Sequence, residues 1–148
     1  MPQKDLLMPW RNILKNVTLP LEALPISKSE RVAQAREALE KVGLSGCESE
    51  RPSELSGGMR QRVSFARTLV QLWHGRELML LDEPFSALDS LTRISMQDWL
   101  IGQVKGLNAT VMTVTHDVEE AMLLGNKIFL LSGRPVKQIK VIDVSHIG

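Results

Sequence analysis

Two acidic residues directly follow a short apolar run in the second half of the chain. The run covers residues 78–81, and Asp82 and Glu83 come next. A run of this length is typical of a buried strand, and parallel sheets bind ligands at the carboxyl ends of their strands. In phosphoryl transfer, the first acid of such a pair helps to hold Mg²⁺, and its neighbour orients or deprotonates the attacking water. Taken alone, the pair is better explained as a helix-capping dipeptide after a core strand.

A serine and two glycines precede an apolar stripe with helical spacing. Ser56, Gly57 and Gly58 stand at the start of this pattern, so a helix is predicted to begin at the glycine pair. The amides at a helix start bind anions, and glycine lets a phosphate approach the backbone closely. An ordinary serine-capped helix start explains the same residues equally well. The apolar stripe consists of Met59, Val63, Ala66 and Val70.

A histidine directly follows the run rich in β-branched residues at 109–115. His116 and Asp117 follow this run, again at the expected ligand edge of a sheet. A histidine there can hydrogen-bond a terminal phosphate, although a lone histidine at a strand end is more often structural. A metal site of His116 with Glu119 and Glu120 is excluded, because neither the number nor the spacing matches two-histidine zinc motifs.

The strands and helices that must carry these residues alternate along the chain. Their order implies right-handed crossovers and a parallel sheet covered by helices, with an edge strand within residues 136–144. The proline-rich first 25 residues are expected to form a structured loop with one helical turn, and residues 45–54 a second loop. Helices are expected over residues 27–43, 57–70, 89–106 and 118–124, and strands over 78–81, 109–115 and 127–132.

Composition and charge exclude several classes of protein. The chain has 148 residues, 43% hydrophobic and 24% charged, which is enough for one domain with a single core. A formal net charge of +1 gives no chain-wide basic field for nucleic acid. The single cysteine, Cys47, fits a reducing compartment. The apolar runs fall short of the roughly 20 residues of a membrane helix, and the amino terminus shows no export signal.

Five short motifs occur in a fixed order along the chain. Gln3 is followed by LSGGMRQR at residues 55–62, ELMLLDEP at 77–84, SALD at 86–89 and TVTHD at 113–117. In order and spacing they resemble the Q-loop, signature motif, Walker B motif, D-loop and switch histidine of the ATP-binding-cassette (ABC) family of ATPases. The resemblance covers essentially the whole chain. It implies an α/β fold, namely a partial P-loop NTPase (RecA-like) core with a parallel sheet plus the ABC helical subdomain.

The resemblance implies ATP and Mg²⁺ as cofactors. It also implies a role at these cofactors for each of four residues. Gln3 would contact Mg²⁺ or the attacking water and relay to the transporter. Asp82 would serve Mg²⁺, and Glu83 would be the general base. His116 would contact the γ-phosphate.

In this family two ATPase subunits hold two ATP molecules between them, head to tail, so part of each site comes from the partner subunit. By resemblance, Ser56, Gly57 and Gly58 would clamp the γ-phosphate of ATP on the opposite subunit. Gln61 of the same motif would also belong to the nucleotide site. Asp89 would cross the dimer interface.

Two further stretches, residues 3–17 and 132–135, resemble the ATPases of nitrate, sulfonate and taurine importers. Importers of pyrimidine precursors share both stretches, so the substrate stays open. The implied partners are a second ATPase subunit, transmembrane permease subunits docked between Gln3 and Leu55, and, indirectly, a periplasmic or lipid-anchored solute-binding protein. Nucleic acid is not among them. The implied location is cytoplasmic, peripheral on the inner face of the plasma membrane.

The family's phosphate-binding loop, G-x-x-x-x-G-K followed by Ser or Thr, does not occur in the sequence. In the family Gln3 follows a strand, whereas here only Met1 and Pro2 precede it. A truncated domain is therefore expected, whether as a fragment, a split or degraded gene, or a start codon placed too late. Residues 1–75 would form the Q-loop and helical subdomain ending in the signature helix, and residues 76–148 the C-terminal part of the RecA-like core.

Two functions stay open. The first is the ATP-hydrolysing subunit of an importer for a small anion such as nitrate, sulfonate or taurine, seen incompletely. The second is a catalytically inactive ABC fragment that acts at most as a partner-binding module. DNA-repair and chromosome-organising relatives are disfavoured, because they carry long heptad coiled coils and this sequence has none.

Overall fold

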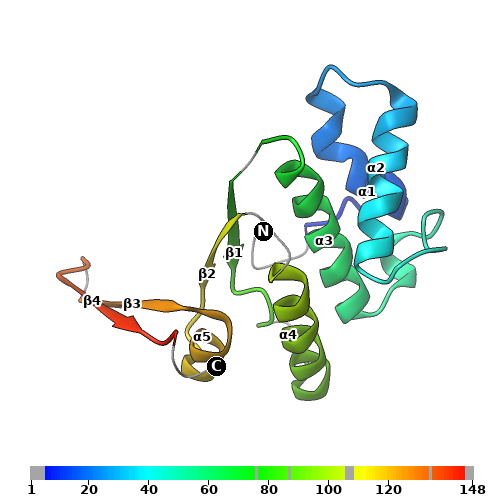
Figure 1. Ribbon diagram of the computed structural model, residues 1–148. Coiled ribbons are helices and arrows are strands. Elements are labelled where there is room, and N and C mark those ends of the chain that lie inside the picture. The colour runs from blue at the N-terminus through cyan, green and yellow to red at the C-terminus, as the bar shows by residue number, and fades with distance from the viewer. Residues whose placement is uncertain (1–5, 76, 87, 106–108, 134, 146–148) are drawn as a thin grey trace.

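The computed structural model describes residues 6–75, 77–86, 88–105, 109–133 and 135–145. The first half of the described chain is helical, and strands and helices alternate in the second half (Figure 1). The helices are α1 (Ile13–Thr18), α2 (Lys28–Lys41), α3 (Gly57–Leu72), α4 (Ser90–Val104) and α5 (Val118–Leu124), with the short 3₁₀ helices η1 (Leu19–Ala23) and η2 (Pro52–Glu54). The strands are β1 (Leu78–Asp82), β2 (Thr110–Val114), β3 (Lys127–Ser132) and β4 (Gln138–Asp143).

Three helices begin at side chains that cap them, at the starts of predicted helices. Ser27 caps α2, Ser56 caps α3 and Asp89 caps α4, each accepting a hydrogen bond of 3.1–3.2 Å from an amide one turn ahead. Gly43 follows α2 with a φ of +70°, which glycine adopts without steric cost. The predicted helices at these places are confirmed, and so is the short helix over residues 118–124.

The amino-terminal segment is more helical than the sequence predicts. It forms α1 followed by η1 where we expected a loop with one helical turn. Asn12 caps α1 by accepting a hydrogen bond from a main-chain amide at 2.9 Å. Pro20 lies in the first turn of η1, where a missing N–H costs no hydrogen bond. The apolar side chains of Ile13, Val17 and Leu21, four residues apart, are fully buried, so their burial outweighs the proline signal.

The strands β1 and β2 pair in parallel, as predicted, and α4 makes the crossover between them. The register places Leu78 opposite Thr110 and Asp82 opposite Val114. Both strands therefore end at the same edge, which is where the sequence places its acidic pair and its histidine.

The third predicted strand pairs differently, and the expectation of three parallel strands was wrong. In the described part of the chain β3 joins β4 in an antiparallel hairpin rather than joining β1 and β2. The hairpin projects away from the helices (Figure 1). Local pairing needs only a short connection, and Gly133 with a φ of +87° turns the chain there. The Lys137 amide closes the turn by donating to the Ser132 carbonyl at 2.9 Å.

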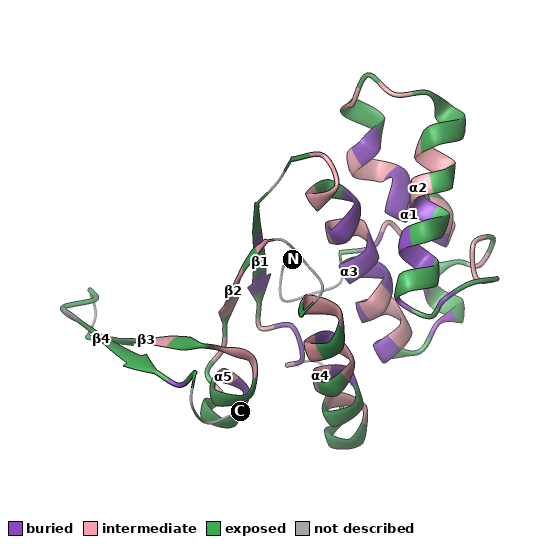
Figure 2. Cartoon of the chain, viewed as in Figure 1, coloured by how far each residue is buried: buried purple, intermediate pink, exposed green. Residues whose placement is uncertain are grey.

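The buried core lies mainly among α1, α2, α3 and the inner side of β1 (Figure 2). Met79 and Leu81 of β1 are buried against the helices. The helix α3 supplies many buried positions, including Val63, Ala66 and Val70, which belong to the predicted stripe. Among the described residues, no helix combines the length and the apolarity that a membrane span requires.

The strands also carry large apolar side chains that are exposed. Leu78, Leu80, Met112 and Val114 of the parallel pair are each 51–56% exposed. The hairpin also exposes apolar side chains: Phe129 is 56% exposed, and Leu131 on the same face is 57% exposed. Contiguous apolar exposure of this kind is uncommon in a monomer and is typical of an interaction surface.

We expect the 148-residue chain, purified alone, to bind a hydrophobic dye strongly and to unfold gradually on heating, because its exposed strands leave the sheet incompletely packed. Dye fluorescence and calorimetry measure both properties. Replacing Phe129 and Leu131 together by lysine should lower the dye signal, because both lie on one face of the hairpin. A sharp, cooperative transition with little dye binding would contradict this expectation.

Candidate functional site

The carboxyl ends of β1 and β2 bring Glu83 and His116 into direct contact. Glu83 Oε1 lies 2.7 Å from His116 Nδ1, although 33 positions separate the two residues in the sequence. The parallel pairing creates this contact, and the Glu83 amide extends it by donating to the Val114 carbonyl at 2.8 Å. Two residues that the sequence predicts as catalytic thus lie side by side.

Glu83 adopts a left-handed backbone conformation. Its φ of +47° is rare for a residue with a side chain and costs about 1–3 kcal/mol. Its amide is bonded to Val114, and its carbonyl accepts from the Ser86 amide at 3.3 Å and from the Ser86 hydroxyl at 3.0 Å. Both main-chain groups of Glu83 are therefore fixed, and the carboxylate is held toward the sheet edge.

The carboxylate of Glu83 is largely shielded from solvent, with 19% of its side chain exposed, whereas the ring of His116 is 79% exposed. The hydrogen bond to Glu83, together with the negative charge of that carboxylate, raises the pKa of His116. The ring is thus open to an incoming ligand on one side while Glu83 holds it on the other.

Asp82, the last residue of β1, lies exposed at the same sheet edge. Its carboxylate is a hard oxygen donor and fits Mg²⁺, which binds proteins through one or two carboxylates and completes its shell with phosphate and water. Within the described residues, no group of three or more His, Cys, Asp or Glu side chains is placed to hold a metal ion alone. The role of Asp82 at Mg²⁺ stays a prediction.

The start of α3 is an open helix end. Ser56 and Gly57 are exposed, whereas Gly58 is buried. A Cβ added to Gly58 would lie 2.9 Å from Thr92 Cγ2, and one added to Gly57 would lie 3.6 Å from Leu88. Gly58 is therefore needed for the close approach of α3 and α4, a packing role that the sequence pattern did not reveal.

Gln61 is buried beneath this helix start. Its side-chain amide donates a hydrogen bond to the Pro84 carbonyl, and so ties α3 to the turn that follows Glu83. This contact gives Gln61 a structural task, and its role at a nucleotide stays a prediction. No local pattern indicates the contact, because 23 positions separate the two residues.

Asp89 occupies the start of α4. Its carboxylate accepts a hydrogen bond from the Thr92 amide at 3.1 Å, and hydrogen bonding from Thr92 lowers the pKa of Asp89. Because Thr92 also abuts Gly58, the capped starts of α3 and α4 are neighbours. Ser56, Gly57 and Asp89 are therefore exposed in one region, with Gly58 and Gln61 buried beneath them, whereas Gln3 lies outside the described residues.

A polar cluster behind His116 was not anticipated. Arg93 Nη1 of α4 lies 3.9 Å from a carboxylate oxygen of Asp117, the residue that caps α5. Thr115 Oγ1 donates to Glu120 at 3.1 Å and accepts from the Asp117 amide at the same distance. Burial raises the pKa of Glu120. The cluster joins α4 to α5 and fixes the turn that carries His116.

Comparison with known proteins identifies the class to which this fold and site belong. The ABC transporter family profile matches residues 1–86, and the chain belongs to that family. The fold is the predicted one, a mixed helical and parallel-sheet part of a P-loop NTPase core. An ABC transporter solved in an inward-facing conformation matches with a TM-score of 0.82 and 28% identity, over 99% of this chain and 58% of that one. A dimeric ATP-binding cassette in a post-hydrolysis state with ADP and Pi matches with a TM-score of 0.67 and 34% identity, over 86% of this chain and 55% of that one.

Several of the curated relatives are named as import ATP-binding proteins. The formylaminopyrimidine import protein ThiZ of Halalkalibacterium halodurans is 44% identical, over 97% of this chain and 57% of that protein. The taurine import protein TauB of Rhizobium johnstonii is 41% identical, over 98% of this chain and 54% of that protein. The aliphatic sulfonates import protein SsuB 1 of Rhodococcus jostii is 46% identical, over 90% of this chain and 51% of that protein. The chain thus spans about half the length of the curated relatives it matches.

Proposed function

We propose that this chain is part of an ATPase subunit that couples ATP hydrolysis to import of a small anion such as nitrate, a sulfonate or taurine. The observation that carries the proposal is the contact between Glu83 and His116 at the edge of the parallel strands, beside Asp82. An acid that is shielded from solvent and fixed at its backbone suits the activation of a water molecule. The relatives named for taurine and sulfonate import support the choice of substrate class.

Within this proposal the residues of one chain have separate tasks. Glu83 accepts a proton from the attacking water, and His116 contacts the terminal phosphate through its exposed ring. Asp82 would hold Mg²⁺, which supplies charge neutralisation at the phosphates when bound. Gln3 completes the group by contacting Mg²⁺ or the water.

A second subunit supplies the other wall of the site in this proposal. The exposed amides at the start of α3 face an anion that the partner subunit holds, and the positive end of the helix dipole favours that anion. Ser56 and Gly57 provide the accessible surface, and Asp89 lies beside them at the start of α4. The dimeric cassettes among the matched structures support a head-to-tail pair.

The remaining partners follow from the importer role. Permease subunits dock on the helical part between Gln3 and Leu55, where Trp10 is 72% exposed. A periplasmic or lipid-anchored solute-binding protein delivers the solute, and the ATPase lies on the cytoplasmic face of the plasma membrane. The residues that contact the solute belong to those other subunits.

Growth tests this proposal directly. A strain that lacks the gene should fail to grow on nitrate as the sole nitrogen source, or on taurine or an alkanesulfonate as the sole sulfur source. The wild-type gene should restore growth, and a Glu83→Gln version should not. Unchanged growth of the deletion strain on all three compounds would remove this substrate class.

The second candidate is a catalytically inactive ABC fragment that binds a partner. The exposed apolar side chains of β1 and β2, including Leu80 and Val114, favour it, because a partner element would cover them. In that case the 148-residue chain gives no titration heat with Mg-ATP and releases no phosphate. Micromolar binding, or turnover above that of Glu83→Gln, would exclude this candidate.

A further inference from the structure

Arg93 of α4 contacts two segments that come from different parts of the chain. Its Nη2 donates a hydrogen bond to the Leu88 carbonyl at 3.3 Å, and its Nη1 lies 3.9 Å from a carboxylate oxygen of Asp117. Leu88 belongs to the loop between β1 and α4, and Asp117 directly follows His116. One guanidinium therefore joins the loop before α4 to the turn that carries the histidine.

The Leu88 end of this link lies at the start of α3. Leu88 is buried, and a Cβ added to Gly57 would lie 3.6 Å from its side chain. The Leu88 amide donates to the Phe85 carbonyl at 3.1 Å, so the loop has a defined path. The next residue, Asp89, is exposed. This loop therefore borders the surface that the proposed function assigns to the partner subunit.

The Asp117 end of the link fixes the main chain around His116. One carboxylate oxygen of Asp117 accepts from two amides in the first turn of α5, at 2.9 and 3.1 Å, and the other oxygen is the one that faces Arg93. The Asp117 amide donates to Thr115 Oγ1 at 3.1 Å. A shift of Asp117 would therefore move the turn from which the His116 ring reaches Glu83.

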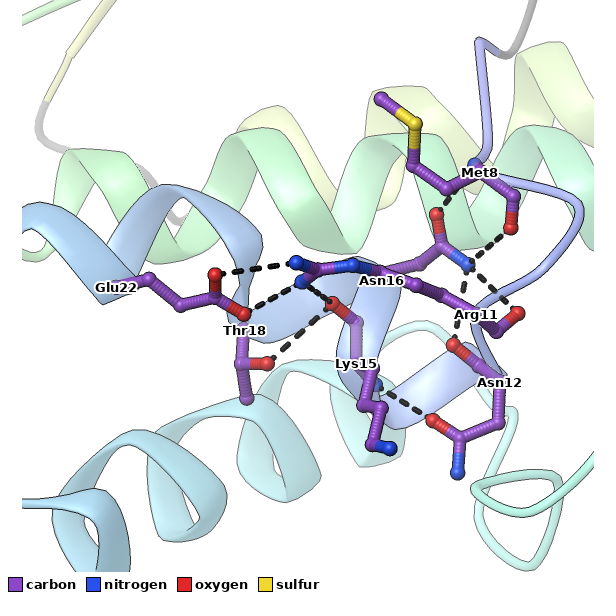
Figure 3. A network of polar contacts seen from close by, with 7 residues as sticks. All are labelled: Met8, Arg11, Asn12, Lys15, Asn16, Thr18 and Glu22. Atoms are coloured by element: carbon purple, nitrogen blue, oxygen red, sulfur yellow. Dashed lines mark hydrogen bonds and ion pairs between the residues drawn. The ribbon is translucent and has the colours of Figure 1, made fainter.

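Asn16 of α1 shows, in another part of the chain, how a buried polar side chain is fully paired. Its amide nitrogen donates to the carbonyls of Met8, Arg11 and Asn12 at 3.0–3.2 Å (Figure 3). Its amide oxygen accepts from the Met8 amide at 2.7 Å. Both polar atoms of this side chain have partners, which is the usual state of a buried polar group.

The cluster behind His116 differs from that arrangement. The Nε atom of Arg93 and the Oε1 atom of Glu120 are buried, and neither has a hydrogen-bond partner among the residues that the structure describes. An unpaired buried polar atom costs folding free energy. Stability alone therefore does not account for an arginine at this position.

We propose that Arg93 is a positioning residue for His116. It ties the turn after the histidine to the loop at Leu88, so that the His116 ring keeps its place relative to the surface on which the partner subunit docks. Its effect reaches the histidine through Asp117. The inference rests on the proposed function, because it takes His116 to act at the terminal phosphate.

The helix α4 does not depend on Arg93 in order to fold. Asp89 caps the helix by accepting from the Thr92 amide at 3.1 Å. Met96 and Leu100 are buried and anchor the helix to the core. Arg93 is only half-buried. Methionine at this position keeps an unbranched side chain, so it should remove both polar contacts and leave the helix in place.

ATP hydrolysis by the full-length subunit is the first test. Arg93→Met should lower kcat about 5-fold with little change in KM, because it disturbs a group that acts at the terminal phosphate. Arg93→Lys keeps a cation and should recover part of the loss. Lys105→Met is the control, because it removes an exposed cation at the other end of α4, and it should leave kcat unchanged.

A double-mutant cycle tests whether Arg93 acts through Asp117. Asp117→Asn keeps the oxygen that caps α5 and removes the charge that faces Arg93, so it should lower kcat by a similar factor. Adding Arg93→Met to Asp117→Asn should lower kcat by less than about 2-fold more, because the contact is already lost. Losses that multiply in the double variant would overturn the proposal.

Amide exchange gives a readout that does not depend on turnover. Asp117→Asn should speed exchange at the Leu88 amide with an unchanged melting temperature, and it should have no such effect in the Arg93→Met background. Unchanged exchange at Leu88 overturns the link while leaving the proposed function intact. Because Asp117→Asn keeps the helix cap, it decides the question even where Arg93→Met lowers the melting temperature. A wild-type subunit that releases no phosphate from Mg-ATP would instead refute the proposed function, and the role of Arg93 with it.

Discussion

Replacing Glu83 by glutamine should lower ATP turnover at least about 100-fold and leave ATP binding intact. The amide keeps the size of the carboxylate and can still hydrogen-bond His116, which lies 2.7 Å away. It cannot accept a proton from water, so the expected loss falls on kcat alone. Phosphate release measures turnover in the full-length subunit, and calorimetric titration with Mg-ATP measures binding.

Glu119→Gln is the matched control, because Glu119 is an exposed residue of α5 and undergoes the same chemical change. It should leave both quantities near their wild-type values. Hydrolysis by Glu83→Gln within a few-fold of wild type would show that Glu83 is not the general base.

Replacing Ser56 by arginine should block hydrolysis, with a loss of about 100-fold, while the variant chain still binds ATP. Ser56 is exposed at the open start of α3, so a long cationic side chain would occupy the space that the partner's phosphate needs. In the proposed geometry Ser56 contacts the nucleotide that the opposite subunit holds. The substitution should therefore affect hydrolysis without affecting ATP binding to the variant chain itself. Equal loss of binding and hydrolysis would contradict that geometry.

Two controls sharpen the Ser56 experiment. Ser27→Arg removes an equivalent cap, since Ser27 caps α2 in the same way at 3.1 Å, and it corrects for the stability of about 1 kcal/mol that a cap provides. Mixing Ser56→Arg with Glu83→Gln subunits is the second control. A mixed pair contains one site built from two intact halves, so some activity should return if Ser56 acts across the interface.

The sequence predicts well the features that depend on residues close together in the chain, such as helix starts. The sequence predicts the starts of α2, α3 and α4 to within a residue or two, because a cap and the amide it bonds are only three residues apart. The parallel pairing of β1 and β2 follows from the strand–helix–strand order. That order also predicts the shared edge at which Glu83 and His116 lie.

Contacts that depend on how elements pack against or pair with particular neighbours could not be predicted. The bond of Gln61 to Pro84 and the packing of Gly58 on Thr92 depend on how α3 lies against its neighbours. The hairpin of β3 with β4 was missed for a related reason: strand order constrains parallel crossovers, but a strand whose next neighbour is local can pair with it instead. The amino-terminal segment is helical because its apolar side chains are buried, and local propensity does not predict that burial.

The left-handed backbone at Glu83 implies a conflict between folding stability and the proposed activity. Glycine adopts a φ of +47° without steric cost, so Glu83→Gly should relieve this backbone strain. The same change removes the proton acceptor of the proposed chemistry. A laboratory selection for heat resistance alone would therefore favour loss of the acid at this position. Under the proposed function, turnover requires the glutamate at this position, so a more heat-resistant version of the chain would have to gain its stability elsewhere.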